Sequence, residues 1–156
     1  MLNSLSALVI ISVVAVLVWV VRIDYRSLRI PNKMVLLLLA QYFVWASLTG
    51  FATIIGDLVA GTVLFLIALI SWLFRMMGAG DVKLYVALGM FIGFDHLSLY
   101  VVLLFLISVV FVVLIRLSKF VNLGPRMNEI RTSGKAPYAV PMCFAAIPAI
   151  LVRTFA

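Results

Sequence analysis

Residues 78–83 read Gly-Ala-Gly-Asp-Val-Lys and lie between two apolar runs, residues 57–74 and 84–94. Only 5 of the 156 residues are acidic, and 67% are hydrophobic. A charged side chain at the centre of a bilayer costs about 2.5–3.5 kcal/mol on insertion scales, so an acidic residue beside apolar runs is a candidate functional residue. Asp81 is therefore the first candidate functional residue, and a second acidic residue on the same side of the membrane would be a candidate partner for it.

The composition is that of a membrane protein. Charged residues make up 11% of the chain, whereas about 25% is usual in soluble domains. The 12 Lys and Arg residues outnumber the 5 acidic ones, and the net charge is +7. These basic residues lie in short segments between apolar runs, where they act as topology signals and contact anionic lipid. We therefore expect a bilayer with anionic lipid as a partner, and no nucleic acid.

The chain has a single cysteine, Cys143, inside an apolar run, where we expect a small buried hydrophobic residue. One cysteine allows neither a disulfide within the chain nor a CxxC zinc site. His96 is the single histidine and has no clustered carboxylates beside it. We therefore expect neither a metal nor a cofactor.

Six apolar runs predict an all-α integral membrane protein with six transmembrane helices. A helix that crosses the hydrocarbon core needs about 17–25 residues, and five of the runs come close to this length. The fourth run is shorter and can begin at Asp81. The whole chain, residues 1–156, is expected to form one domain. The runs are residues 5–21, 34–50, 57–74, 84–94, 97–115 and 136–152.

The distribution of Lys and Arg predicts the orientation in the membrane. Residues 22–33, 75–83 and 116–135 contain eleven of the twelve basic residues, and only Arg153 lies elsewhere. Cytoplasmic segments carry the excess of positive charge in membrane proteins. The N-terminus and the C-terminus are therefore predicted to lie outside, and the loops that carry the candidate residues are predicted to face the cytoplasm.

This orientation places Asp24 and Asp81 together at the cytoplasmic edge, and Asp57 and Asp95 on the other side. Two carboxylates that share a site cannot both ionise easily, so one can take a proton from water while the other donates to a carbonyl, as in aspartic proteases. Two simpler interpretations remain open. Asp81 can act as the N-cap of a helix, and Asp24 can form a surface ion pair with its neighbouring arginines.

Other residues near the aspartates allow two interpretations each. Gly78 and Gly80 permit close approach of a substrate backbone, or simply a turn between helices. Lys83 can tune the carboxylate pair, or extend to the membrane surface without a catalytic role. Pro31 and Asn32 suit the start of a helix.

Together these motifs resemble the type IV prepilin peptidases, which are GxGD membrane aspartyl proteases. The resemblance rests on Asp24 with Ile-Pro-Asn at residues 30–32, on residues 78–83, and on Lys-x-Pro-Tyr-Ala from Lys135, and it covers nearly the whole chain. It implies an aspartic-type endopeptidase of the cytoplasmic (inner) membrane that removes the short basic leader of prepilin-like proteins, with Asp24 and Asp81 as catalytic residues. The expected site-shaping or substrate-binding residues are Ile30, Pro31, Asn32, Gly78, Gly80, Lys83, Pro137 and Tyr138.

The chain departs from the longer members of this family, which carry an insertion with two CxxC pairs and also N-methylate the mature pilin. It lacks those cysteines and is similar to the short Flp/Tad-type and archaeal forms, so the resemblance does not extend to methyl transfer. An alternative function is a small proton-coupled transporter or pilus-assembly subunit that uses the two aspartates as a relay. A third is a structural membrane scaffold. Presenilin-like proteases share GxGD but lack the Ile-Pro-Asn element.

Overall fold

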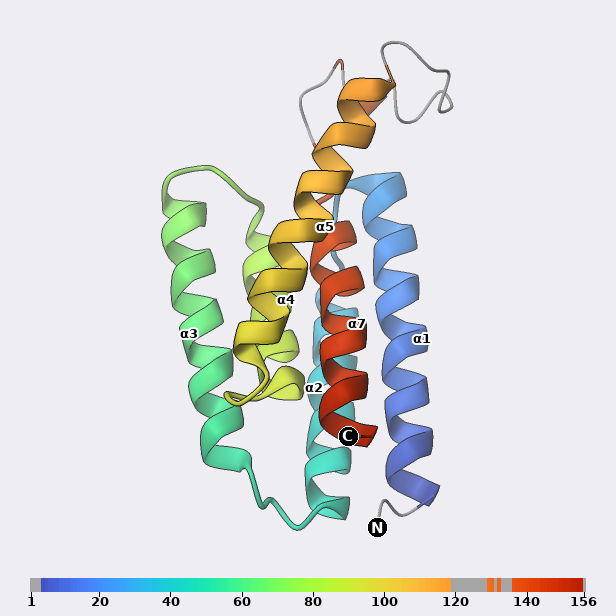
Figure 1. Cartoon of the computed structure of the whole chain (residues 1–156), viewed down its shortest axis with the longest axis vertical. Helices are drawn as coiled ribbons and strands as arrows, with labels where there is room; N and C mark the ends of the chain where they lie inside the picture. The colour runs from blue at the N-terminus through green and yellow to red at the C-terminus, as the bar shows by residue number, and fades with distance from the viewer. Residues whose placement is uncertain (1–3, 119–128, 131, 133–135, 156) are drawn as a thin grey trace.

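The computed structural model describes residues 4–118, 129–130, 132 and 136–155, and the elements in this part of the chain are helices (Figure 1). This confirms the all-α prediction. In chain order the helices are α1 (Ser4–Ser27), α2 (Asn32–Leu48), α3 (Ile54–Leu73), α4 (Ala79–Ile92), α5 (Leu97–Leu117) and α7 (Ala139–Phe155).

Three of these helices, α1, α3 and α5, are long and apolar enough to cross a membrane. Helices α2 and α7 are apolar but have 17 residues each, and α4 has 14. The prediction of six spanning helices is thus supported by length and composition for three of them. On α5 the buried residue is Tyr100, and large apolar side chains elsewhere on this helix are exposed. A surface of this kind is stable in lipid rather than in water.

Helix α1 is longer than predicted and carries Asp24 inside the helix instead of in a loop. Its buried residues recur every three or four positions, and Asp24 continues the stripe formed by Val13, Leu17 and Val20. The helix ends where Leu28 takes a positive φ of 52° and its N–H donates to the Asp24 carbonyl at 2.8 Å, the usual way in which a helix is closed. The predicted loop 22–33 therefore begins six residues too early.

Helices α4 and α7 form the centre of the bundle. Buried residues make up 9 of the 14 in α4 and 10 of the 17 in α7. Helix α3 packs on α4, α5 packs on α7, and α1 contacts both α2 and α7. In Figure 1, α3 and α1 form opposite edges of the bundle, with α4 and α7 between them.

Two glycines allow α3 and α4 to lie unusually close. A Cβ atom on Gly89 would lie 2.6 Å from the Cα atom of Gly61, which is closer than such atoms ever approach. Small residues at such crossings are a common means of packing helices in membranes. Neither glycine of this pair was among the residues predicted from the sequence.

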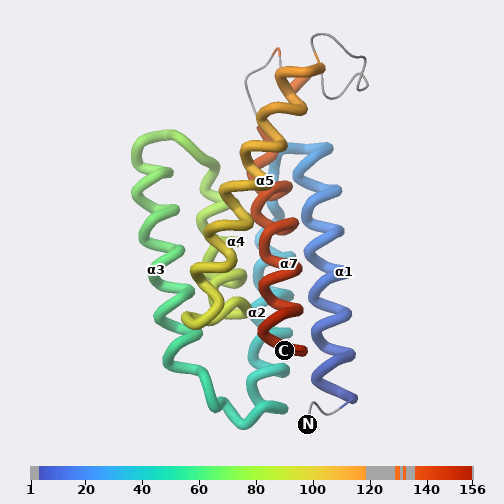
Figure 2. The backbone as a smooth tube through the Cα atoms, viewed as in Figure 1, coloured from blue at the N-terminus to red at the C-terminus, as the bar shows by residue number. Residues whose placement is uncertain are grey.

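Neighbouring elements of the chain alternate in direction, as the tube in Figure 2 shows. The last turn of α1 and the first turns of α2, α4 and α7 consequently lie at one end of the bundle. The first turn of α3 and the last turns of α4 and α7 lie at the other end. Asp24 and Asp81 are thereby placed at the same end.

Candidate active site

Asp24 points into the bundle from the last turn of α1. Its side chain belongs to the buried set, with 4% of the residue exposed. Its Oδ2 atom accepts a hydrogen bond of 3.1 Å from the backbone N–H of Ala139, the first residue of α7. The N–H groups in the first turn of a helix lack partners within that helix and stabilise a negative charge. The simpler interpretation of Asp24 as a surface residue is therefore wrong.

Asp81 lies in the first turn of α4 and is also buried. The N-cap of α4 is Gly78, and Asp81 is the third residue of the helix, so the interpretation of Asp81 as the N-cap is wrong. Its Oδ2 atom instead accepts a hydrogen bond of 3.1 Å from the N–H of Gly78. An acidic residue at this position reaches back to the N-cap backbone, as in a capping box.

The surroundings of Asp81 disfavour its ionised form. Burial is the main cause and the negative charge of Asp24 is the second, while the N–H of Gly78 acts in the opposite direction, and together they raise the pKa of Asp81 to about 6. Asp81 lies at the N-terminal end of α4, which is not among the three helices long and apolar enough to cross a membrane. Two carboxyl groups whose negative charges repel in this way cannot both ionise easily.

Asp24 and Asp81 line one cavity of about 380 Å³. The structure thus brings together the two aspartates, Gly78 and Tyr138 from the predicted set. The cavity wall also includes Leu28, Arg75, Met76, Met77 and Ala136. These five residues lie next to the ends of helices and in the connection between α3 and α4, and apart from the positive charge of Arg75 no sequence pattern singled them out.

The Ile-Pro-Asn element supports the start of α4 from outside this cavity. A Cβ atom on Gly80 would lie 3.2 Å from the Cβ atom of Ile30, so a side chain at position 80 would crowd Ile30. The ammonium group of Lys83 donates to Oδ1 of Asn32 at 3.1 Å. Lys83 is two residues from Asp81 and therefore faces another side of the helix. The two motifs thus contact each other directly through Gly80 and Lys83.

The two remaining predicted elements are prolines at helix starts. Pro31 is the N-cap of α2, with φ −65° and ψ 136°. Pro137 is buried, and its carbonyl accepts the N–H of Val140 at 3.2 Å, which begins the turn that becomes α7. Tyr138, by contrast, has 43% of its surface exposed and borders the cavity.

Cys143 is buried and free, one turn into α7, as the sequence analysis expected. Within the described ranges, no three His, Cys, Asp or Glu side chains are grouped so that they could hold a metal ion. The chemical groups of the cavity are therefore two carboxyl groups, one guanidinium, one phenol and backbone amides.

Fold and site define a helical membrane protein with a pair of interacting carboxyl groups in a cavity at one end of its bundle. The chain belongs to the type IV leader peptidase family, whose family model matches residues 11–117. The matched range contains both aspartates, Ile-Pro-Asn at residues 30–32 and the Gly-Ala-Gly-Asp-Val-Lys stretch, and it ends before α7. Comparison with curated proteins and with solved structures gives no match.

Proposed function

We propose that this chain is an aspartic endopeptidase of the inner membrane that removes the short basic leader of prepilin-like proteins. The observation that carries the proposal is the shared cavity of Asp24 and Asp81 in a chain of the type IV leader peptidase family. A volume of about 380 Å³ accommodates a short length of extended peptide together with a water molecule.

The hydrogen bonds of the two carboxyl groups suit a division of labour. Each Oδ2 atom accepts one backbone N–H, from Ala139 for Asp24 and from Gly78 for Asp81. In the described part of the chain, neither Oδ1 atom has a protein partner, so each can face water or substrate. Because the two groups repel each other when both are charged, the pair holds one proton at intermediate pH.

The reaction then follows the scheme of a paired-carboxylate hydrolase. The ionised carboxylate takes a proton from water as the water oxygen bonds to the scissile carbonyl carbon, and the protonated carboxyl group donates its proton to the carbonyl oxygen. The tetrahedral intermediate collapses when the C–N bond breaks: the leaving amine takes up a proton from the pair, and one hydroxyl group of the intermediate returns its proton to the pair as the new carboxyl group forms. One water is consumed, and the pair again holds one proton at the end of the cycle.

The charge distribution favours a cytoplasmic location for the cavity. Residues 22–33 and 75–83 lie at the cavity end and hold six Lys and Arg residues. Arg153, at the opposite end, is neutralised by an ion pair of 2.7 Å with Asp57. The excess of Lys and Arg at the cavity end supports an orientation with the cavity in the cytoplasm. A basic leader would reach the carboxyl pair there while the apolar segment of the substrate stays in the bilayer.

The test is co-expression with a candidate prepilin and separation of precursor from processed product by gel electrophoresis. We expect Asp24→Asn and Asp81→Asn each to reduce cleavage by about 10³-fold or more, since members of a catalytic unit are not additive. The matched control is Asp95→Asn, which changes an exposed carboxylate at the other end of the bundle. Cleavage near the wild-type rate by either dyad variant would refute the mechanism.

A further inference from the structure

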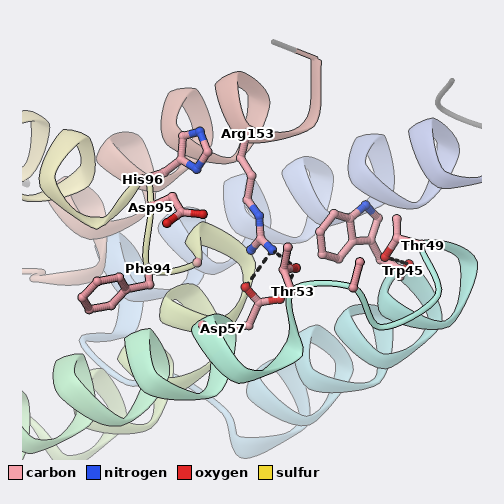
Figure 3. A pocket seen from close by; sticks show the side chains of 11 residues that line it. Trp45, Thr49, Thr53, Asp57, Phe94, Asp95, His96 and Arg153 are labelled. Carbon is pink, nitrogen blue, oxygen red and sulfur yellow. Dashed lines mark hydrogen bonds and ion pairs between the residues drawn. The ribbon is translucent and has the colours of Figure 1, made fainter.

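A second polar cluster lies at the end of the bundle opposite the two aspartates (Figure 3). Arg153, in the last turn of α7, forms an ion pair of 2.7 Å with Asp57, in the first turn of α3. The side chains of both residues are nearly inaccessible, with 8% and 2% exposed. A buried charge pair needs good geometry and further hydrogen bonds to offset its desolvation.

The guanidinium of Arg153 also closes the C-terminal end of α4. Its Nη1 atom donates to the carbonyls of Met90 at 3.0 Å and Phe91 at 2.9 Å, which are among the last four of that helix. The carbonyls of the last helical turn lack partners within the helix and attract a cation. Gly93 follows the helix with φ +71°, and a Cβ atom there would lie 2.7 Å from Nη1, so the guanidinium occupies space that a side chain would fill.

The remaining contacts draw in α2 and α3. Arg153 Nη2 donates to the hydroxyl of Thr53 at 2.7 Å, and the guanidinium lies 4.8 Å from the ring centre of Trp45 in α2. The second carboxylate oxygen of Asp57 accepts from Tyr42 at 2.7 Å and from Thr53 at 3.0 Å. Figure 3 shows the guanidinium between Trp45 and Asp57. One arginine thereby connects the ends of four helices.

Two of the helices that meet at this cluster, α4 and α7, contact the carboxyl pair at their other ends. Helix α4 carries Asp81 in its first turn and is held by Arg153 in its last turn. Helix α7 donates the N–H of Ala139 to Asp24 at its start and carries Arg153 near its end. The contacts therefore run from Asp24 along α7 to Arg153, and from Arg153 back along α4 to Asp81.

We propose that Arg153 is a positioning residue, which fixes the axial register of α4 against α7 and thereby the placement of Asp81 relative to Asp24. This rests on the proposed function for its catalytic consequence. A helix rises about 1.5 Å per residue, so a slip of α4 by less than one residue would move Asp81 by about 1 Å. A displacement of about 1 Å in reacting groups can cost about 100-fold in rate.

The ion pair alone does not explain the choice of arginine. Lysine would retain the charge opposite Asp57, but only a planar guanidinium can donate to the α4 carbonyls through one nitrogen and to Asp57 and Thr53 through the other. The geometry thus requires one group with two donor nitrogens, which can bind the end of α4 and the start of α3 at the same time. That requirement concerns position rather than charge.

The experiment compares Arg153→Lys with wild type in the full chain, with Asp95→Asn as the matched control. Asp95 borders the same cavity as Arg153 but is exposed. Two quantities are measured on folded protein isolated by size-exclusion chromatography: leader cleavage, with kcat and KM separated, and the titration of the Asp81 carboxyl group by infrared difference spectroscopy against Asp81→Asn. Thr53→Val removes one bridging hydroxyl and is the milder second variant.

For Arg153→Lys we expect kcat to fall about tenfold or more, with KM within about twofold, because substrate contacts are untouched. We also expect the apparent pKa of Asp81 to move, because the charge of Asp24 contributes to it. Thr53→Val should shift both quantities in the same direction by less. Asp95→Asn should leave both unchanged.

Unchanged kcat per folded molecule together with an unchanged Asp81 titration in the folded variants would overturn the proposal, even if the variants unfold more easily. The titration needs no substrate. If wild type cleaved no prepilin, the proposed function would fail, while a moved Asp81 titration would still establish the role of Arg153 in register.

Discussion

Asp81 leads to a quantitative prediction about stability, because its buried carboxylate is costly to ionise. The pKa of Asp81 is raised to about 6 from the ordinary value of 3.8, and one pH unit corresponds to about 1.4 kcal/mol. At pH 7 the folded chain therefore carries a penalty of about 3 kcal/mol that the unfolded chain does not. The residue that we propose for catalysis thus lowers the stability of the fold.

The perturbation is Asp81→Asn, which removes the charge while its amide oxygen can still accept the N–H of Gly78. The folded state has the higher pKa, so wild type gains stability as the pH falls through about 6 and loses it as the pH rises. The variant has no such dependence at this position. We expect it to be more stable than wild type at pH 7 by up to about 3 kcal/mol, and the difference to disappear near pH 4.

The assay is thermal unfolding of the purified protein in detergent micelles, followed by tryptophan fluorescence at pH values from 4 to 8. Asp95→Asn serves as the control, because an exposed carboxylate should leave the wild-type pH dependence unchanged. If Asp81→Asn unfolds at or below the wild-type temperature at pH 7, burial does not disfavour the charge of Asp81 and the reasoning fails.

Three further predictions concern the site and its support. Leader cleavage should decline as the pH rises above about 6, because the carboxyl pair loses its shared proton, and a pH–rate profile measures this. Gly89→Ala should destabilise the fold by about 1–3 kcal/mol in chemical denaturation, because its Cβ atom would meet the backbone of Gly61 at 2.6 Å; an unchanged midpoint would contradict the close crossing. Lys83→Met and Asn32→Ala should each lower the free energy of unfolding by about 1 kcal/mol or less, because each removes the same hydrogen bond. The double variant should lose no more than either single variant, and additive losses would contradict that contact.

The sequence predicted the helices well because their apolar runs are long and separated by charged or turn-forming residues. It misjudged the end of α1 because a search for uninterrupted apolar residues stops at Arg22. The buried stripe of α1 continues by periodicity to Asp24, which is charged yet faces inward. The spacing of Asp24 from the buried residues before it indicates that it belongs to the helix, although its charge suggests a loop.

The candidate site was predicted in its acidic residues but not in its walls. The positive-inside rule placed Asp24 and Asp81 on one side of the membrane, and the structure places them at one end of the bundle. The positions of Arg75, Met76 and Met77 depend on the path of a connection, which periodicity does not determine. The rule also put Asp57 and Arg153 on a common side, but 96 residues separate them and no local pattern indicates their ion pair.

The hydrogen bond from Ala139 to Asp24 shows that the carboxyl pair depends on a part of the chain beyond the range that the family model matches. The family match ends at residue 117, yet the donor that satisfies Asp24 belongs to α7. A buried carboxylate without such a donor would be desolvated and uncompensated. The last helix therefore closes the wall of the site, and we expect substitutions at its start to affect the proposed catalytic centre rather than a peripheral segment.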